Sequence, residues 1–529
     1  MPLVGCSETT GDGGGGGPGG MDGVGGTGPT DPCEDVECND DSACTVHTCE
    51  PDCTDEDGDG HDDVCLAVCV YRDWPTGFPC ECARFDCGVC DGSGRCVEDG
   101  TGGTGGSGGG TGDVFACSAQ GIRSAIVQGG GPHTFDCDGP TTVTTEAEIV
   151  INNNVILDGE GNLTVDGNSS HRVFLVQDVA AELRGFTVSG GMVVSDIGAG
   201  IRNTGELKLV DSTVRGNEAK EPEECEWYSC EVYGGGISNG GHLVLVNSTV
   251  SDNTATIGGG IENRGTLTLT DSSVSQNAGG GIEGGVWVAM TNSTVSQNVG
   301  TGVSANGIVQ VMISTVSRNT AGGIVVQEGP LFVRNSTVSG NTAVEAGGGI
   351  RVHGYSDPET ETEAFLVNST VSGNTASNGS GIACFSATFT LLNSTVSDGI
   401  YVTSGDATDP PASIIATATL IEGQCTEAGG DVTWMSNGHN LESPGDTCGF
   451  DQGTDTTGVT ETELNLGPLA NNGGPTMTHK PGDGGLGDGS AAIDQISEAA
   501  CEVTTDQRGE PRPETDGTMC DVGAFEVQP

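Results

Sequence analysis

The chain has 529 residues, of which 92 are glycine and only 4% are aromatic, so its length allows several domains while its composition excludes one conventional core of large side chains. Lys and Arg number 17 against 75 Asp and Glu, which gives a formal charge of −58. This charge opposes attraction to nucleic acid or anionic lipid and favours divalent cations, so we expect no nucleic-acid partner.

The N-terminal stretch, residues 1–32, combines a short motif with a low-complexity run. "LVGC", ending at Cys6, resembles the bacterial lipobox, in which the cysteine becomes the lipidated first residue of the mature chain. The resemblance implies a lipid anchor at Cys6, membrane attachment only through that lipid, and a true start upstream; a chance match of small residues is the alternative. The following Gly, Thr and Asp residues bury too little apolar surface to fold and predict a disordered tether.

Residues 33–97 form a cysteine-dense module, which a Gly-rich linker at 98–113 separates from the rest. Of the 22 cysteines, twelve lie between Cys33 and Cys96. This density is typical of proteins that mature where disulfides persist, so we predict an extracytoplasmic protein, at the outer membrane or cell surface. No apolar run approaches the ~20 residues of a membrane span.

Within the module, "DEDGDGHDD" spaces acidic residues around a glycine turn. Alternating carboxylates can surround one hard cation with oxygen ligands. The run resembles the calcium loops of EF-hands and thrombospondin type 3 repeats, although Leu66 stands where an EF-hand has a bidentate Glu. We therefore predict Ca²⁺ as a cofactor, and an acidic solvated turn is the alternative. The predicted ligands are Asp55, Asp57, Asp59 and Asp63.

A repeat occupies residues 114–455. "NSTVSDNTATIGGGI" at 247–261 returns as "NSTVSGNTAVEAGGGI" from residue 335, and its valine recurs every 21 to 26 residues apart from two insertions. Apolar residues seven and five positions before the valine alternate with polar ones, which is the period of a strand. In-register repeats of short strands and turns predict a parallel β-helix, since each strand then pairs with its equivalents in neighbouring coils. A leucine-rich repeat is excluded because its L-x-x-L-x-L signature is missing.

Asparagine follows the valine by three residues in seven of the nine units, and a Gly-rich run ending in an aliphatic residue comes next. We expect the asparagines to stack, to hydrogen-bond their own turn and the next coil, and to adopt the left-handed conformation at the corner. The glycines are expected to supply positive φ angles. The predicted structural column contains Asn217, Asn253, Asn277, Asn298, Asn319, Asn341 and Asn374.

Two further resemblances concern the repeat and the C-terminal end. The V-x-x-N and GGGI steps resemble polymorphic outer-membrane protein repeats, and the tract from about 117 to 450 resembles the pectate-lyase-like superfamily, which implies a right-handed helix. Residues 456–529, with "LGPLANNGGPTMTHKPGDG" and "CDVGAFE", resemble the choice-of-anchor Q domain. We expect this domain to cover the last open strand edges and to contain a disulfide between Cys501 and Cys520.

Candidate functional residues lie in an insertion rather than in the coils. Thr and Ser flank the repeat valines, except that Arg215 follows Val214. They are expected to point outward and to form a flat, nearly uncharged hydroxyl face without a convergent acid and base, so we name no catalytic residue. The insertion at 219–233 carries aromatic residues beside carboxylates, and Cys225 and Cys230 are placed to close its tip. Rigid rings suit sugar or protein binding, and packing against the loop's own coil is the alternative. The candidate ligand-binding residues are Trp227, Tyr228 and Tyr233.

The sequence thus predicts an all-β, right-handed parallel β-helix preceded by a disulfide-rich module and a disordered tether. The favoured function is a lipid-anchored, monomeric, non-catalytic adhesin-like or envelope-structural module that binds a glycan or a cell-surface protein. A polysaccharide lyase or glycoside hydrolase of the pectate-lyase-like class is the main alternative. A hydroxyl face that orders water or binds a polysaccharide surface, as in solenoid ice-binding proteins, is a third.

Overall fold

The computed structural model describes residues 113–528, except 223, 225–229, 355–361, 406–409, 486–488 and 515–516, together with four short strands nearer the N-terminus. Two compact units divide the chain, Met1–Ser107 and Gly108–Pro529. In the first unit, β1 (Cys49–Thr54) pairs antiparallel with β2 (Val64–Cys69), and β3 (Val89–Cys90) pairs with β4 (Cys96–Val97). The predicted lipid attachment at Cys6, the tether and the four predicted calcium ligands lie outside the described residues.

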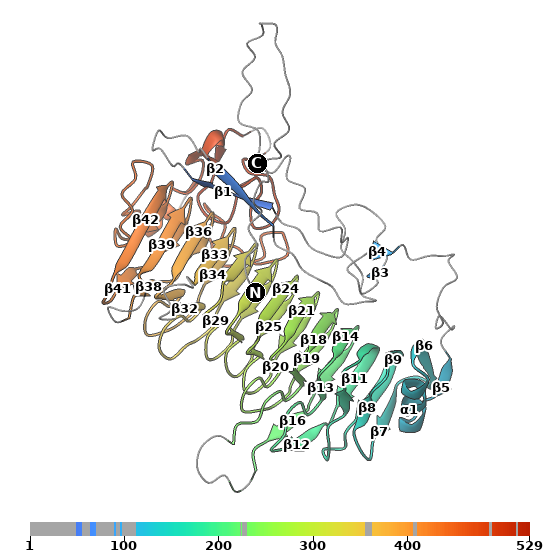
Figure 1. Cartoon of the computed structure of the whole chain (residues 1–529). Helices are drawn as coiled ribbons and strands as arrows, with labels where there is room; N and C mark the ends of the chain where they lie inside the picture. The colour runs from blue at the N-terminus through green and yellow to red at the C-terminus, as the bar shows by residue number, and fades with distance from the viewer. Residues whose placement is uncertain are drawn as a thin grey trace, which may run out of the picture. The chain divides into compact units, whose positions relative to one another are not determined.

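The second unit is a parallel β-helix whose coils each contribute strands to three sheets (Figure 1). Sheet 1 contains 12 strands, and those of the repeat units follow the Gly-rich runs. They are β8 (Ile149–Ile151), β10 (Phe174–Val176), β13 (Ile201–Asn203), β17 (Ile237–Asn239), β20 (Ile261–Asn263), β23 (Ile282–Glu283), β26 (Val303–Ala305), β29 (Ile324–Gln327), β32 (Ile350–His353), β35 (Ile382–Phe385), β38 (Ile400–Thr403) and β41 (Cys425–Glu427).

Sheets 2 and 3 hold the strands before and at the repeat valine, and two long strands, β9 (Val155–Asp166) and β11 (Ala180–Ser189), run through both. After the first coils, the strands of sheet 2 are β14 (Glu206–Val210), β18 (His242–Val246), β21 (Thr266–Thr270), β24 (Trp287–Thr291), β27 (Ile308–Met312), β30 (Leu331–Arg334), β33 (Glu363–Val367), β36 (Thr388–Leu392), β39 (Ala412–Thr417) and β42 (Val432–Gly438). Those of sheet 3 are β15 (Thr213–Arg215), β19 (Thr249–Ser251), β22 (Ser273–Ser275), β25 (Thr294–Ser296), β28 (Thr315–Ser317), β31 (Thr337–Ser339), β34 (Thr370–Ser372), β37 (Thr395–Val396), β40 (Leu420–Glu422) and β43 (Leu441–Ser443).

The alternation of apolar and polar residues places one narrow core along the coils. In β21 the burial of T-L-T-L-T alternates as the sequence predicts, with Leu267 and Leu269 fully buried. The repeat valines pair with one another in register, as Val274 does with Val295. Because the same residue type recurs at each level, every coil fills the same cross-section. The predicted all-β parallel β-helix is therefore confirmed.

The first coil is covered by a helix that the sequence analysis did not predict. It is α1 (Ala119–Gln128), which lies between β5 (Val114–Ala116) and β6 (Gly130–Asp136), ahead of β7 (Thr141–Thr144). The Ser118 hydroxyl accepts a hydrogen bond from the Gly121 amide and caps the helix. Ile122 and Ile126 are buried in the main core, so the helix shields the first open strand edges. A short pair, β12 (Met192–Val194) with β16 (Glu218–Lys220), extends two coils sideways.

The seven predicted asparagines stand in one buried ladder. Asn298 is representative: its backbone amide and its Nδ2 both donate to Asn319 Oδ1, at 3.1 and 3.0 Å. Nδ2 also donates to the Val274 carbonyl of the preceding coil at 3.1 Å. Oδ1 in turn accepts from the amide and the Nδ2 of Asn277. Each such side chain therefore satisfies two backbone groups of the preceding coil that water cannot reach, and it also bonds the asparagine side chain of the next coil.

The left-handed corner lies one residue earlier than we expected. Positive φ angles occur at Asp252, Gln276, Gln297 and Arg318, each directly before a ladder asparagine, and the asparagines themselves are not left-handed. A second left-handed residue, such as Asn247, precedes each serine of the N-S-T triplets. That serine is buried and forms its own ladder, as Ser248 shows by donating its amide to Ser272 Oγ.

Glycine has two roles in the Gly-rich runs, of which positive φ is only one. Gly258 has a φ of +61°, as expected for the first glycine of a run. The third glycine is required by close approach instead: a Cβ on Gly281 would lie 2.6 Å from the Gly302 carbonyl oxygen and 2.8 Å from Asn298 Nδ2. The missing side chain at this position lets the coils approach the asparagine ladder.

The end of the solenoid is covered by residues 444–456 and not by the later part of the predicted C-terminal domain. Phe450 is buried in the main core, and a disulfide joins Cys448 to Cys425 of β41. Thr456 bridges to Leu441 of β43, the last strand of sheet 3. This short segment therefore closes the final coil.

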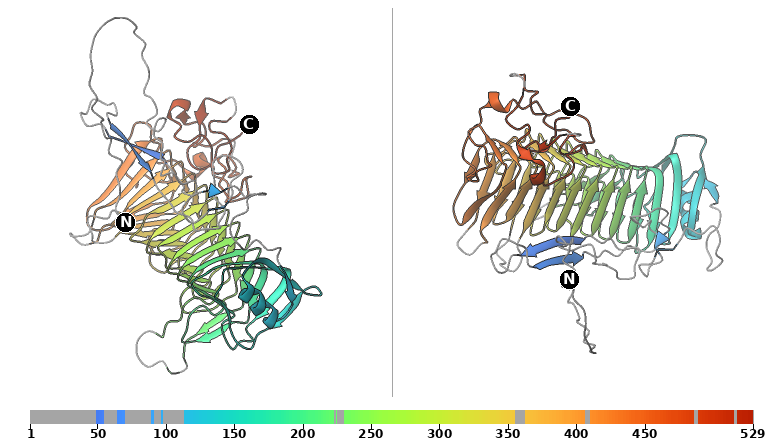
Figure 2. Two further views of the ribbon diagram at one scale, coloured as in Figure 1. Left: turned by 45° about the vertical axis from the view of Figure 1, so that its right-hand side comes forward. Right: turned by 90° about the horizontal axis from the view of Figure 1, so that it is seen from above.

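Residues 466–528 lie along the side of the last coils instead, as Figure 2 shows in red. They contain little regular structure: β44 (Ile496–Ser497), η1 (Glu498–Ala500) and β45 (Met519–Cys520), after the short α2 (Glu461–Leu464). The expected disulfide between Cys501 and Cys520 is present. We call residues 466–528 the C-terminal segment.

The C-terminal segment covers part of the outward hydroxyl face. Thr337 and Thr370 have no exposed surface, and Thr395 is only 3% exposed. Gln507 Nε2 donates to Thr337 Oγ1 at 3.0 Å, and Gln507 Oε1 accepts from Thr370 Oγ1. The Ala524 amide donates to Thr395 Oγ1 at 3.0 Å. The face is thus not open to solvent at these coils, because the hydroxyl column recognises the chain's own C-terminal segment.

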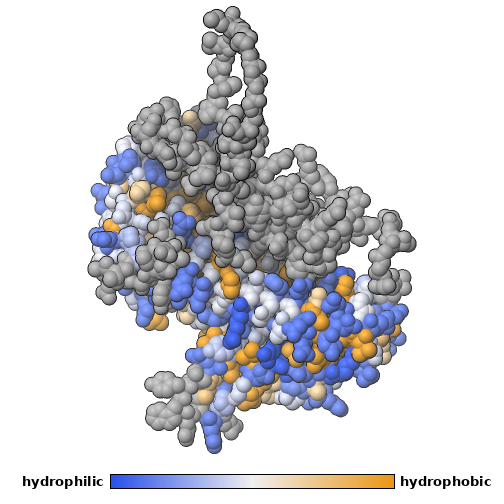
Figure 3. Space-filling view, viewed as in Figure 1, coloured by the Kyte–Doolittle hydropathy of each residue, from blue (hydrophilic) through white to orange (hydrophobic). Residues whose placement is uncertain are grey.

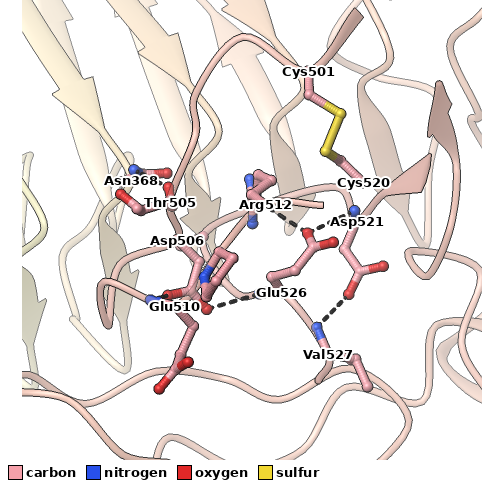
Figure 4. A network of polar contacts seen from close by, with 12 residues as sticks. Asn368, Cys501, Thr505, Asp506, Glu510, Arg512, Cys520, Asp521, Glu526 and Val527 are labelled. Atoms are coloured by element: carbon pink, nitrogen blue, oxygen red, sulfur yellow. Dashed lines mark hydrogen bonds and ion pairs between the residues drawn. A yellow bond between two sulfur atoms is a disulfide. The ribbon is translucent and has the colours of Figure 1, made fainter. Parts of the chain in front are cut away.

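A buried charge network ties the turns of the C-terminal segment together (Figure 4). Arg512 and Glu526, both without exposed side-chain surface, form an ion pair with a 3.1 Å N–O distance. Burial raises the pKa of Glu526 to about 7 and that of Asp521 to about 6. Arg508 pairs with Asp506 at 2.8 Å and lies 3.6 Å from the Phe525 ring centre. These contacts order a segment that has few strands of its own.

Candidate functional site

A hollow of about 550 Å³ lies at one edge of sheet 1, where β20 and β23 end and where the turns after β20, β23 and β26 leave the sheet. Its lining combines charged, aromatic and backbone groups, including Tyr233, Glu262, Arg264, Glu283, Gly285 and Asn306. The space exists because the chain carries glycines immediately after Glu283. Gly284 and Gly285 both have positive φ, +78° and +119°, and no side chains, so the turn leaving β23 does not fill it.

Two glutamates form the floor of the hollow. Glu262 of β20 and Glu283 of β23 pair in register, so their Cα atoms are about 4.8 Å apart. Glu262 is only 4% exposed, and each of its carboxylate oxygens accepts a hydrogen bond from the protein. Ser238 Oγ donates to Oε2 at 2.7 Å, and Arg264 Nε donates to Oε1 at 2.5 Å. Ser238 and Arg264 therefore hold the Glu262 carboxylate in a fixed orientation.

Glu283 lies in a different environment from its neighbour. Burial raises the pKa of its carboxyl group, and a hydrogen bond from Ser304 only partly offsets this. Arg264 forms an ion pair with Glu262, two residues away on the same coil, rather than with Glu283. The raised pKa of Glu283, beside a second carboxyl group that is ion-paired, is compatible with a role as a general acid.

Tyr233 forms one wall of the hollow and is the last residue of the predicted binding loop. The Arg264 guanidinium carbon lies 5.6 Å from the Tyr233 ring centre, within the range of a cation–π contact. The Tyr233 hydroxyl donates to Glu231 Oε2 at 2.7 Å, and this bond, with burial, raises the pKa of Tyr233. The ring is thereby held at the edge of the site.

Trp227, Tyr228 and Cys225 lie outside the described residues, whereas Cys230 is disulfide-bonded. The structure therefore brings Tyr233, of the three candidate aromatic residues, to a site built from other strands.

The sequence analysis missed the three charged residues of the site, Glu262, Arg264 and Glu283. A signal exists: the strand after the Gly-rich run reads I-S-N at 237–239 but I-E-N-R at 261–264, and I-E recurs at 282–283. Because these strands pair in register, two successive glutamates at the outward position predict stacked carboxylates. We considered only the columns flanking the repeat valine, which belong to sheet 3.

Metal-ligand clusters and membrane-spanning helices were sought in the part of the chain that the structure describes. There, no group of three or more His, Cys, Asp or Glu side chains is placed to hold a metal ion. Likewise, no described helix is long and apolar enough to cross a membrane. The calcium ligands and the lipidated cysteine that we predict remain predictions.

Comparisons with known proteins concern the fold. The family described as "Right handed beta helix region" matches residues 198–365, the span that contains the hollow. The fold is therefore a right-handed parallel β-helix. Among solved structures, the chain is similar to the crystal structure of the pectate lyase Pel9A, with a TM-score of 0.31 and a sequence identity of 14%. The superposition covers 79% of this chain and 97% of that chain. A likeness at this level does not transfer that enzyme's activity to this chain. No curated protein matches the sequence.

Proposed function

We propose that the protein is a lipid-anchored, extracytoplasmic β-helix that binds a neutral glycan without cleaving it, in the hollow of sheet 1. The observation that carries the proposal is the contact of Tyr233 with the Arg264–Glu262 ion pair. An aromatic face beside fixed donors and acceptors suits a sugar ring, whose C–H face packs on the aromatic ring while its hydroxyls take hydrogen bonds. Lipid attachment at Cys6 and calcium binding by the cysteine-dense module belong to the same proposal and rest on the sequence.

Charge selects the class of glycan. The floor of the hollow carries two carboxyl groups against one guanidinium group, and the whole chain has a formal charge of −58. An acidic polymer would be repelled both at long range and at the site. A neutral glycan pays no such penalty and can form hydroxyl hydrogen bonds with the Glu283 carboxyl group, which is less buried than that of Glu262.

Binding is expected to depend on both walls of the hollow. We expect Arg264→Ala or Tyr233→Leu to weaken the affinity for a neutral glycan by about tenfold or more, since each removes a contact residue worth more than ~1 kcal/mol. The measurement is a glycan array with wild type, followed by titration calorimetry of the best neutral hit. Arg215→Ala is the matched control, because Arg215 is an exposed arginine on sheet 3. Unchanged affinity in both hollow variants would contradict the proposal.

Glycoside hydrolysis in the same hollow is a second candidate, favoured by the stacked Glu262 and Glu283. Hydrolysis needs one carboxylic acid to protonate the leaving oxygen and one carboxylate to stabilise or attack the sugar. Glu283, with its raised pKa, would be the acid, and Glu262, paired with Arg264, the carboxylate. Hydrolysis fits better than lyase chemistry because two carboxyl groups are available while the arginine is already ion-paired.

One assay separates binding from hydrolysis. Under the binding proposal, we expect no release of reducing ends from neutral or acidic polysaccharides incubated with the full-length protein. Release that Glu283→Gln lowers by about 10²- to 10⁴-fold would establish hydrolysis instead, since this is the usual contribution of a general acid. Its rate should then fall as pH rises through the raised pKa of Glu283, because the acid loses its proton.

A further inference from the structure

A second cluster of aromatic and cationic side chains lies on sheet 1, nearer the C-terminal end of the solenoid. The His353 and Phe385 rings stack with centres 5.6 Å apart, and Phe385 meets Tyr401 edge-on at 5.9 Å. The Arg351 guanidinium carbon lies 5.2 Å from the Phe385 ring centre. All four side chains are partly exposed. We call these four residues the aromatic platform.

Two residues of the aromatic platform, Arg351 and Tyr401, belong to the same outward column as the two glutamates of the hollow. His353 and Phe385 lie two residues further along β32 and β35, in the adjacent outward column. Strand pairing places successive members of the column of the hollow side by side in neighbouring coils. The members are Glu262, Glu283, Ser304, Val325, Arg351, Ala383 and Tyr401. At ~4.8 Å per coil, Glu283 and Arg351 are about 14 Å apart and the whole column spans about 29 Å. Figure 1 shows the strands of sheet 1 as one row along the coils.

The part of the column between the two sites is shallow. Its two outward residues, Ser304 and Val325, are short, so this column presents no long side chain between Glu283 and Arg351. The positive charge at the platform end of the column is balanced, because the Arg351 guanidinium lies 4.0 Å from the exposed Glu345 carboxylate. An extended, uncharged chain laid along the solenoid axis would therefore meet both sites.

We propose that sheet 1 carries one continuous binding track, on which the hollow holds one part of a linear neutral polysaccharide and the aromatic platform holds a more distant part. This inference rests on the proposed glycan binding and specifies its ligand as a polymer. The Phe385 and Tyr401 rings supply contact area for sugar rings at low entropic cost. Because both sites engage one molecule, the second contact is intramolecular and adds to affinity without a second binding event.

Other exposed aromatic side chains do not share this placement. Phe332 and Phe365 stack at 5.3 Å on sheet 2, and Phe332 is 38% exposed, but neither lies on sheet 1. In the space-filling view, hydrophobic residues form separate patches among hydrophilic ones (Figure 3). The Phe332–Phe365 pair on sheet 2 therefore serves as an internal control for non-specific binding to exposed aromatic side chains.

The test compares polymer with short ligand on the full-length protein. The probes are linear β-glucan, xylan and mannan, each with its own disaccharide, titrated against wild type, Phe385→Leu, Tyr401→Leu and Arg264→Ala. Leucine keeps apolar volume at the platform, and circular dichroism verifies the fold. For the polymer that binds wild type, we expect both platform variants to lose about tenfold in affinity. Affinity for its disaccharide should stay unchanged in these variants, whereas Arg264→Ala should weaken both ligands.

The outcomes distinguish this inference from the proposal on which it rests. Phe332→Leu is the matched control and should leave polymer affinity unchanged. If the platform variants bind polymer as wild type does while Arg264→Ala does not, the track is refuted and the hollow remains a binding site. An equal loss in Phe332→Leu would also refute the track, because the loss would not be specific to sheet 1. If neither polymers nor disaccharides bind wild type, both proposals fail for neutral glycans.

Discussion

Asn298→Val is expected to lower the free energy of unfolding of the solenoid by roughly 2 to 6 kcal/mol. The side chain accepts from the amide of Asn277 and donates to the Val274 carbonyl, and both groups are buried in the coil stack. Valine fills a similar volume but offers no partner, so two buried polar groups lose a hydrogen bond at about 1–3 kcal/mol each. Thermal and denaturant unfolding of the purified protein measure the effect.

The control for this variant is Ser296→Ala, two residues earlier in the same coil, where the side chain is on the outward side of β25. It should change stability by no more than about 0.5 kcal/mol. A midpoint for Asn298→Val equal to that of the control would mean that the asparagine ladder contributes little, and that apolar stacking alone holds the coils together.

Gln507→Leu is expected to release the C-terminal segment while leaving the coils folded. Gln507 Nε2 donates to Thr337 Oγ1, Thr476 Oγ1 and the Met477 carbonyl, and Oε1 accepts from Thr370. Leucine leaves these buried groups without partners, at a cost of about 2 kcal/mol or more. This corresponds to a roughly thirtyfold larger undocked population.

Hydrogen exchange followed by mass spectrometry separates this local effect from global unfolding. The Ala524 amide, which donates to Thr395, should exchange faster, and protease should cut the C-terminal segment sooner. Amides of β19, β22 and β25 should keep their protection. Gln495→Leu, an exposed glutamine in the same segment, is the matched control. Protection lost equally throughout the solenoid would contradict local release.

Most of the coil could be predicted because its signal is local and repeated. The alternation around Leu267, the valine at Val274 and the asparagine at Asn277 recur at near-constant spacing, so register follows from superposing the repeats. The prediction placed the left-handed residue at the asparagine, but it lies at Gln276. A buried ladder amide and a left-handed corner are adjacent in sequence, and composition favours asparagine for both roles.

Only one of the residues of the candidate site was predicted from the sequence. Tyr233 was singled out by its rarity in a chain with five tyrosines, but Glu262 and Glu283 look like two of 75 acidic residues until the strands are aligned. The α1 helix was missed because its apolar residues Ile122 and Ile126 precede the repeat, whose strong strand pattern dominated the interpretation.

The sequence by itself determined the parallel β-helix, the residues of its core and the asparagine column, because stacked identical residues specify both their neighbours and their burial. Only the tertiary structure decided that Tyr233 meets Arg264 across a hollow, and that Gln507 docks on Thr337, 170 residues earlier in the chain. Such contacts join segments with no common repeat. They depend on where an insertion and a C-terminal segment return to the coils, and this is set by the shape of the folded solenoid rather than by any periodic pattern.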